Sequence, residues 1–305
     1  MKKLLLPFML LLVLIISACG NANESQGNEA KDKKPDTVTY ESENGPIEVP
    51  ADPKRVVVLA SFVGNVLALD TNVVGVDSWS KDNPRFKDQL KDVEVVTEDD
   101  LEKIIELNPD LIIGLSTTKN IDKLQEIAPT VTYTYGKVDY LTQHLEIGKA
   151  LNKETEAQTW VDDFKADAKA AGKDIKAKIG EDATVSVIEN FDKQLYVFGD
   201  NWARGTEILY QEMELKMPEK VKEMALKDGY YAISPEVLSD YAGDYVIFSK
   251  NADGDTSFQE TDTYKNIPAV KNNQLFEANA KEFYFNDPIS LEYQLNFFKE
   301  KFLQQ

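Results

Sequence analysis

The stretch KETEAQTWVDDFKADAKAAGKDIKAK, residues 153–178, decides the fold of this chain. It is rich in Ala, Lys, Glu and Asp, and Trp160, Phe164 and Ile175 are its sparse apolar contacts. This composition predicts one helix of about 26 residues, roughly 39 Å long at 1.5 Å per residue. Gly172 weakens the helix by about 1 kcal/mol relative to Ala without necessarily ending it. A helix with a largely polar circumference suits a strut between two lobes better than a core position.

Strands and helices alternate along the chain before this helix. Short β-rich runs at 55–59 and 72–76 alternate with helical stretches, and NPDLIIG at 108–114 is typical of a turn that leads into a buried strand. Such alternation predicts an α/β lobe with a mostly parallel sheet. We expect this N-terminal lobe to span residues 37–152.

A second α/β pattern follows Gly180. It begins with ATVSVI at 183–188 and ends in a predicted helix over about residues 289–302. We therefore expect a C-terminal lobe at 181–305, joined to the first lobe by an inter-lobe helix at 153–180. The predicted fold class is α/β, with two α/β lobes and one long rigid helix between them.

The first nineteen residues indicate export. Lys2 and Lys3 precede an apolar run that closes with Ile-Ser-Ala-Cys at 16–19, and this order is typical of a secretory signal. The run is too short for an ordinary membrane span. The pattern resembles a bacterial lipoprotein signal, in which residues 1–18 are removed and Cys19 carries the lipid. An ordinary signal peptide with a chance cysteine is the alternative. Residues 19–36 are polar and are expected to form a flexible tether.

The composition excludes several functions. The net charge is −19, and loss of Lys2 and Lys3 with the signal takes it to about −21. So acidic a chain argues against nucleic acid as a partner and against adsorption to anionic lipid by charge. Cys19 is the only cysteine, so a lipidated chain keeps no thiol for disulfides, metal binding or catalysis. The single histidine, His144, argues against a zinc or manganese site, since such sites usually collect several histidines.

Motifs that could indicate an enzyme lack their companions. Ser-x-x-Lys occurs at 78–81 and 116–119, but neither Lys-Thr-Gly nor Ser-Asp-Asn accompanies it. A Ser-His-Asp triad would need His144, which lies in a predicted helical stretch at 140–146 and which we expect to be an exposed or helix-flanking imidazole. A lipid-anchored serine hydrolase is therefore only a distant alternative. Asn-Ala-Asp-Gly-Asp at 251–255 lacks the spacing of a calcium loop and predicts a turn.

Three segments resemble one known family. They are FDKQLYVFGDNWARGTEILYQ at 191–211, Asn-Asp-Pro at 286–288 and Asp-Pro-Lys-Arg at 52–55. Together they resemble the iron(III)-siderophore-binding proteins of ABC importers, in particular the Gram-positive ferric-hydroxamate-binding lipoproteins, over about residues 37–305. The resemblance implies a class III periplasmic-binding-protein-like fold with a helical backbone, and a monomer on the outer face of the cytoplasmic membrane. It also implies a binding protein without enzymatic activity or cofactor, which delivers its ligand to a permease dimer with its ATPase.

The resemblance places the ligand in a shallow cleft between the lobes. Relatives touch it with the tryptophan and arginine of GDNW-x-R-G, here Trp202 and Arg204, and with an upstream tyrosine, here Tyr196. An aromatic residue two positions before Asn-Asp-Pro corresponds to Tyr284, and a tyrosine of the first lobe corresponds to Tyr135. Without the resemblance, Trp202 could equally be a core residue and Arg204 a surface ion pair.

The chemistry of these residues agrees with a ferric hydroxamate. A tris-hydroxamate fills all six positions of the iron, so the protein supplies no metal ligand and binds the oxygens and the organic ring. Arg204 can fork onto those oxygens, and the aromatic side chains provide apolar faces with polar tips. A trianionic tris-catecholate would call for a basic cluster, which three scattered arginines do not provide. A catecholate, haem or a corrinoid remains the alternative ligand. Leu115 stands where a relative has a tyrosine, which puts contacts from this loop in doubt.

Two glutamates correspond to surface residues that, in this family, dock into basic pockets of the permease dimer. By position they are Glu102, at the start of a predicted helix, and Glu236, in Ser-Pro-Glu at 234–236. The alternative is that both simply complement the dipole of a helix N-terminus. The two roles are compatible.

Overall fold

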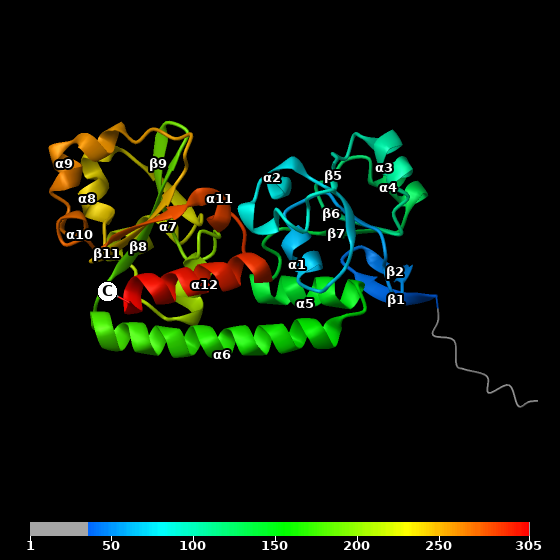
Figure 1. Ribbon diagram of the computed structural model, residues 1–305, viewed down its shortest axis with the longest axis horizontal. Coiled ribbons are helices and arrows are strands. Elements are labelled where there is room, and N and C mark those ends of the chain that lie inside the picture. The colour runs from blue at the N-terminus through cyan, green and yellow to red at the C-terminus, as the bar shows by residue number, and fades with distance from the viewer. Residues whose placement is uncertain (1–35, 305) are drawn as a thin grey trace, which may run out of the picture. The chain divides into compact units, whose positions relative to one another are not determined.

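Helix α6 (Glu154–Ile179) lies along two α/β lobes in the computed structural model, which describes residues 36–304 (Figure 1). Each lobe holds one five-stranded sheet. The predicted α/β fold, with two lobes and one long joining helix, is confirmed. The predicted signal peptide, Cys19 and residues 19–35 of the predicted tether lie outside the described residues. Within residues 36–304, no helix has both the length and the hydrophobicity that a membrane span requires.

The N-terminal sheet has the strand order β5-β4-β3-β6-β7, and every pair in it is parallel, as the sequence predicted. Its strands are β3 (Val56–Val58), β4 (Val73–Val76), β5 (Glu94–Val95), β6 (Leu111–Leu115) and β7 (Thr130–Tyr133). A separate hairpin precedes them, formed by β1 (Thr37–Ser42) and β2 (Gly45–Pro50). The helices of this lobe are α1 (Val63–Leu67), α2 (Ser78–Lys81), η1 (Pro84–Phe86), α3 (Leu101–Leu107), α4 (Ile121–Ile127) and α5 (Tyr140–Ala150).

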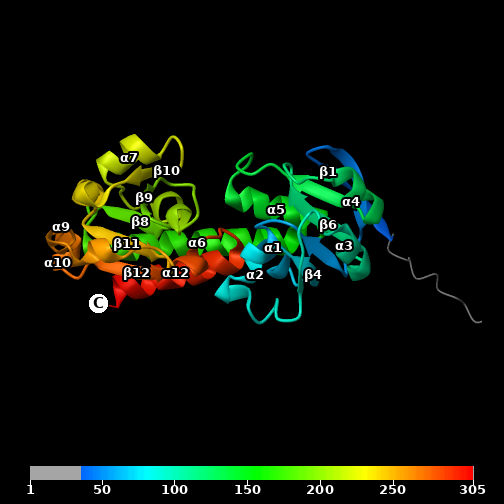
Figure 2. The ribbon, with the colours of Figure 1, turned by 90° about the horizontal axis from the view of Figure 1, so that it is seen from above.

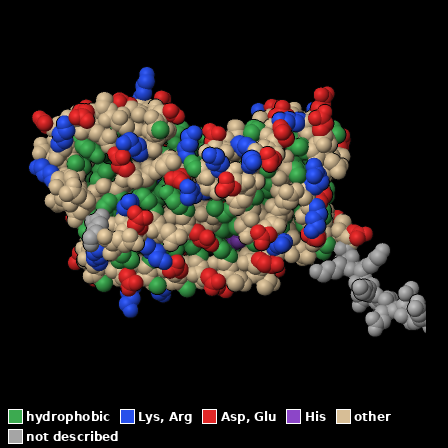
Figure 3. Space-filling view, viewed as in Figure 1, with side chains coloured by type: hydrophobic (Ala, Val, Ile, Leu, Met, Phe, Trp, Pro, Cys, Tyr) green, Lys and Arg blue, Asp and Glu red, His purple; other side chains and the backbone are tan. Residues whose placement is uncertain are grey.

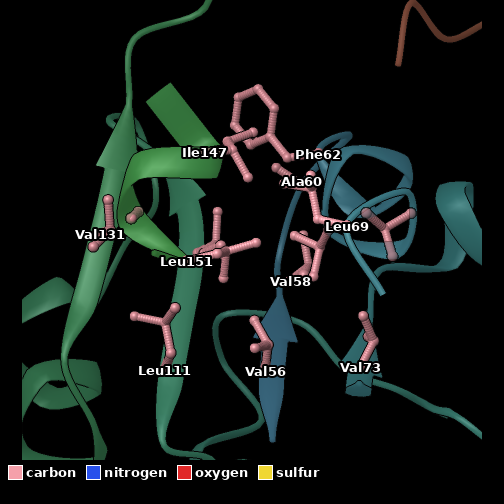
Figure 4. Close-up of a cluster of buried hydrophobic side chains, with 14 of the residues drawn as sticks. Val56, Val58, Ala60, Phe62, Leu69, Val73, Leu111, Val131, Ile147 and Leu151 are labelled. Carbon is pink, nitrogen blue, oxygen red and sulfur yellow. The ribbon is translucent and has the colours of Figure 1, made fainter. Parts of the chain in front are cut away.

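Both faces of this sheet are buried, which explains why its strands are apolar without alternation. Successive residues of β3 point to opposite faces. Val56 and Val58 pack with Ile147 of α5 in one core cluster (Figure 4), whereas Val57 packs with Ile104 of α3 in another. The sheet is therefore a rigid platform whose loops at the carboxyl ends of the strands can carry binding residues.

The C-terminal sheet is mixed, with the order β10-β9-β8-β11-β12. Strands β8 (Val185–Phe191), β11 (Tyr245–Lys250) and β12 (Leu275–Asn279) are parallel, while β9 (Gln194–Phe198) and β10 (Tyr230–Ile233) continue the sheet antiparallel. The helices are η2 (Glu207–Glu212), α7 (Glu219–Ala225), η3 (Pro235–Val237), α8 (Leu238–Tyr241), η4 (Ser257–Glu260), α9 (Asp262–Lys265), α10 (Pro268–Lys271), α11 (Ala280–Phe283) and α12 (Pro288–Leu303). Helix α12 corresponds to the helix predicted at about 289–302.

Helix α6 packs against elements of both lobes through one narrow face. It contacts α5, α12 and η2, and α5 and α12 lie beside it in both views (Figures 1 and 2). Its buried residues are Ala157, Val161, Phe164, Ala168, Ala171, Gly172 and Ile175. This spacing forms a stripe along the helix, and most of the stripe is small, so neighbouring backbones can approach closely. A Cβ atom on Gly172 would stand 2.4 Å from the carbonyl oxygen of Met213, just after η2.

Candidate functional site

A row of side chains crosses the C-terminal sheet near the carboxyl ends of its parallel strands. Tyr196 of β9 pairs with Glu189 of β8, and Glu189 pairs with Ser249 of β11, so all three point to the same face. In open α/β sheets, ligands bind in the crevice outside these strand ends. Tyr196 thereby lies on the same face as a buried carboxylate that the sequence analysis had not singled out.

The loop after β9 places Trp202 and Arg204. Three successive residues, Ala203, Arg204 and Gly205, have φ values of 53°, 58° and 78°, so the backbone turns through a left-handed conformation that non-glycine residues adopt only at a cost. Two hydrogen bonds hold this turn. The Arg204 backbone N–H donates to the Phe283 carbonyl at 2.7 Å, and Thr206 Oγ1 donates to the Ala203 carbonyl at 2.7 Å.

Arg204 is paired within the protein. Its Nε and Nη2 atoms donate to the Glu189 carboxylate at 3.2 Å and 3.0 Å, and the two side chains are 15% and 1% exposed. The pair is therefore a buried, two-bond ion pair and not the surface ion pair that was the alternative for Arg204. The donor fork that we expected to face ligand oxygens faces Glu189, which leaves Nη1 and the flat faces of the guanidinium for other contacts.

Aromatic rings surround Trp202 from both lobes. Tyr230 lies 5.0 Å from it in a tilted arrangement, and Tyr135 of the N-terminal lobe lies 6.3 Å from it edge to face, measured between ring centroids. Tyr196 in turn meets Tyr230 at 5.9 Å. Trp202 is only half-buried, and Tyr135 and Tyr230 are 55% and 41% exposed. These rings form an accessible wall, so Trp202 is not an ordinary core residue.

Tyr284 forms a second contact between the lobes. Its ring stacks on Trp79 of α2 at 4.9 Å with 22° between the planes, and the Arg204 guanidinium lies 4.8 Å from its centroid. Burial raises the pKa of the Tyr284 hydroxyl to about 12, with Glu189 acting in the same direction. The hydroxyl is therefore protonated at neutral pH and can donate a hydrogen bond.

A cavity of about 560 Å³ lies between the lobes, and Tyr135 is the one predicted ligand residue in its lining. Phe62, Asn65 and Tyr135 line it from the N-terminal lobe, and Glu207 and Asn286 line it from the C-terminal lobe. Its volume falls in the range of small-molecule sites, which is about 300–1,000 Å³. Figure 3 shows the surface hollowed between the two lobes, with both basic and acidic side chains around the hollow.

Acidic side chains outnumber basic ones in the lining of this cavity. Lys137 in its lining forms an ion pair with Glu43 at 3.2 Å, and three carboxylates, those of Asp139, Asp200 and Glu207, also line the cavity. Glu207 is 2% exposed, and burial raises the pKa of its carboxyl. Among residues 36–304, no group of three or more His, Cys, Asp and Glu side chains is arranged to hold a metal ion.

The structure brings together the five predicted ligand residues Trp202, Arg204, Tyr196, Tyr284 and Tyr135. Glu102 and Glu236 are both exposed, in the first turns of α3 and η3. Helix α3, and α8 directly after η3, lie on the side opposite α6 (Figure 1). Leu115, at the end of β6, is half-buried against the N-terminal core beside Tyr133.

His144 differs from the expectation. It lies in α5, which confirms the predicted helical stretch, but it is 1% exposed and not exposed as expected, with Nδ1 at 3.1 Å from Asn65 Oδ1. Burial lowers its pKa to about 4, so it is neutral at physiological pH. Lys81 of the first Ser-x-x-Lys donates to the backbone carbonyl of Val93 at 2.7 Å, so this contact directs it to the backbone and not to a catalytic serine. Residues 251–255 form the predicted turn.

Sequence reasoning missed Glu189, Tyr230 and Trp79. Glu189 had a signal, because it directly follows the apolar pair Val187 and Ile188 of a predicted strand, and a carboxylate that is buried in a strand needs a partner. Tyr230 lies on the same sheet face as Tyr196 only because β10 pairs with β9, and Trp79 meets Tyr284 across 205 positions of the chain. No local pattern predicts either contact.

The comparisons with known proteins agree over nearly the whole chain. A family model described as periplasmic binding protein matches residues 56–282. The iron(3+)-hydroxamate-binding protein FhuD of Bacillus subtilis (strain 168) is 40% identical over 300 residues, covering 96% of this chain and 95% of the relative. The iron(3+)-hydroxamate-binding protein YxeB of the same organism is 35% identical over 317 residues, covering 100% and 98%. The solved structure of FhuD2 from Staphylococcus aureus with bound ferrioxamine B matches with a TM-score of 0.78 and 36% identity, covering 83% and 99%.

Proposed function

The chain belongs to the periplasmic binding protein family, and from this premise we propose that it binds iron(III)-hydroxamate siderophores outside the cytoplasm and delivers them to an ABC importer. Two relatives that match it over nearly their full length are named as iron(3+)-hydroxamate-binding proteins, and a matching structure holds ferrioxamine B. These similarities support the class of ligand as well as the family.

The observation that carries the proposal is the aromatic wall around a charge-neutralised arginine. Trp202, Tyr230 and Tyr284 offer broad apolar faces with polar tips, which suit the organic shell of a siderophore. Because the siderophore fills the coordination sphere of the iron, the site needs no metal ligand. The guanidinium of Arg204 is already paired with Glu189, so the site lacks the free positive charge that a trianionic tris-catecholate would call for.

The anchor, the partner and the lack of catalysis are part of the same proposal. Cys19 carries a lipid that holds the protein on the outer face of the cytoplasmic membrane of a Gram-positive bacterium. As a monomer, the protein docks on a permease dimer, which works with its ATPase, through Glu102 and Glu236. Both glutamates are exposed, and helices α3 and α8 lie on the side opposite α6 (Figure 1), which supports this docking. The protein has no enzymatic activity and no cofactor.

Intrinsic fluorescence tests the ligand. The protein has three tryptophans, of which Trp79 and Trp202 lie at the site and Trp160 lies on α6. Titration with ferrioxamine B, ferrichrome and a ferric tris-catecholate should give saturable quenching at submicromolar concentration with the two hydroxamates and weak quenching with the catecholate. Trp202→Phe should reduce the quenching and leave the part that comes from Trp79, whereas the matched control Trp160→Phe should leave the quenching unchanged.

Each other outcome has a distinct meaning. Saturation by the catecholate alone would keep the scaffold and overturn the hydroxamate ligand. A lack of saturable response to all three complexes would contradict the proposal and make haem and corrinoids the next ligands to test.

A further inference from the structure

Glu189 is the buried partner of Arg204. It is 1% exposed in β8, and its carboxylate accepts three hydrogen bonds, from Arg204 Nε at 3.2 Å, Arg204 Nη2 at 3.0 Å and Ser249 Oγ at 2.6 Å. A buried carboxylate with this set of donors is held in one position.

The pairing decides which part of Arg204 remains available. The fork of Nε and Nη2 is occupied by Glu189, and Nη1 makes only a long contact of 3.4 Å to the Trp202 carbonyl. The flat faces of the guanidinium lie 5.0 Å from the Phe198 ring centroid and 4.8 Å from that of Tyr284. The Nε–Nη2 pair is therefore not available to a ligand, which can be met only by Nη1 and the second hydrogen of Nη2.

The pairing also cancels the charge of the arginine. Arg204 acts electrostatically on both Tyr135 and Tyr284, and it is opposed by Glu207 at Tyr135 and by Glu189 and Asp253 at Tyr284. With Glu189 in place, the charge of Arg204 is compensated within the protein. Without it, the guanidinium would present a full positive charge to the cleft at low effective dielectric, where unit charges interact strongly.

We infer that Glu189 sets the charge class of the siderophore, so that the cleft accepts neutral and positively charged ferric hydroxamates and disfavours anionic ones. The inference rests on the proposed function, because it concerns the selectivity of that same site. A purely structural ion pair would also be destabilising to break, but breaking it would not change how affinity depends on the charge of the ligand.

A charge series on one ligand scaffold separates these two roles. Ferrioxamine B carries one positive charge on its free amine, its N-acetyl derivative is neutral, and its N-succinyl derivative is negative, while the coordination of the iron is the same in all three. We expect the wild-type protein to bind the negative derivative more weakly than the positive one. We define the ratio as the dissociation constant of the negative derivative divided by that of the positive one. In Glu189→Gln this ratio should fall by about tenfold, because an uncompensated guanidinium attracts the anion and repels the cation.

Two further variants keep the test specific. Glu219→Gln removes an exposed carboxylate on α7, which pairs with Lys222, and so makes the same change in net charge. It should change the ratio less than twofold. The double variant Glu189→Gln, Arg204→Gln removes both charges and should restore the wild-type ratio even if both ligands bind more weakly.

The outcomes distinguish this inference from the proposed function. A wild-type protein that binds the series but keeps its ratio in Glu189→Gln overturns the inference alone. The inference alone is also overturned if the double variant keeps the lowered ratio, because the effect of Glu189 would then not act through Arg204. A wild-type protein that binds none of the three complexes overturns the proposed function, and the inference with it.

Discussion

At the scale of single residues, the binding wall depends on a backbone conformation that the side chains do not favour. Ala203 and Arg204 both have positive φ, and Gly205 completes the turn where a Cβ atom would stand 2.5 Å from the Phe298 ring. The cost of such conformations, of order 1 kcal/mol or more each, is accepted where the surrounding structure fixes them. Here the Phe283 carbonyl and the ion pair with Glu189 fix Arg204. The strained backbone therefore lies at the same residues as the candidate site.

Asp287 gives a pH-dependent prediction. Its carboxylate caps α12, accepting from the Ile289 and Ser290 backbone N–H groups at 3.0 Å and 3.2 Å, and burial raises its pKa to about 6. Because the folded pKa lies above the ordinary value of 3.8, the folded state binds the proton more tightly than the unfolded state does. The associated stability is present at low pH and is lost as the pH rises through 6.

Asp287→Asn keeps an acceptor for the cap and removes the titration. The free energy of unfolding of the wild type relative to this variant should fall by about 2 kcal/mol between pH 4.5 and 7.5, measured by urea unfolding at each pH. Glu207, whose pKa is also raised, and His144, whose pKa is lowered to about 4, are present in both proteins and cancel in the difference. A difference that stays constant with pH would contradict the assignment to Asp287.

The limits of prediction from sequence are visible at these same residues. Trp202 and Arg204 could be identified because a contiguous segment carries them. The partner of Arg204 could not, because Glu189 lies 15 positions earlier and reaches it only through the β8–β9 hairpin and a left-handed turn. A sequence pattern indicates which side chains carry chemistry, whereas the pairing that sets their charge arises from tertiary contacts.

At the scale of elements, length separates what could be predicted from what could not. Helix α6, with 26 residues, and α12, with 16, have continuous composition and were predicted closely. Helices of four residues, such as α8 and α10, have too few positions to show a period, and they form where the chain must turn between strands. From the sequence alone, Gly172 could be described only by its cost to the helix. In the structure it lies where α6 contacts Met213, the residue after η2.

Gly172→Ala tests this contact. Helix propensity alone predicts a gain of about 1 kcal/mol in the free energy of unfolding. The structure predicts a loss of about 1–3 kcal/mol instead, because the new methyl group would meet the Met213 backbone and force α6 and η2 apart. Thermal or urea unfolding measures the sign.

The neighbouring substitution Ala170→Gly is the matched control. Ala170 is exposed on the same helix, so its replacement should cost about 1 kcal/mol through propensity alone. If packing at residue 172 determines the change in stability, Gly172→Ala and Ala170→Gly should both have a lower free energy of unfolding than the wild type. If Gly172→Ala instead raises the free energy of unfolding while Ala170→Gly lowers it, helix propensity determines both changes and the close approach to Met213 is easily relaxed.

At the scale of the whole unit of residues 36–304, contacts on two sides of the cleft connect the lobes in addition to α6. Trp79 stacks on Tyr284, and Arg85 forms an ion pair with Glu282 at 2.7 Å, with Glu282 only 7% exposed. Tyr140 of α5 donates to Glu212 of η2 at 2.9 Å. Such contacts resist large rotation of one lobe against the other. A permease would therefore recognise a surface whose two halves keep a nearly constant spacing.

This constancy makes the two proposed docking glutamates testable together. Glu102→Lys, Glu236→Lys places a positive charge on each lobe at an exposed position away from the cleft. Ferrioxamine B should therefore bind the variant with an unchanged dissociation constant, whereas siderophore-dependent iron uptake by cells that carry only this variant should be lost, because each lysine would repel a basic pocket of the permease.

The matched control Asp163→Lys, Asp174→Lys makes the same change in charge on the exposed face of α6 and should leave uptake intact. Equal loss of uptake in both variants would point to net charge rather than to docking, and unimpaired uptake in the glutamate variant would show that Glu102 and Glu236 serve only their helix N-termini.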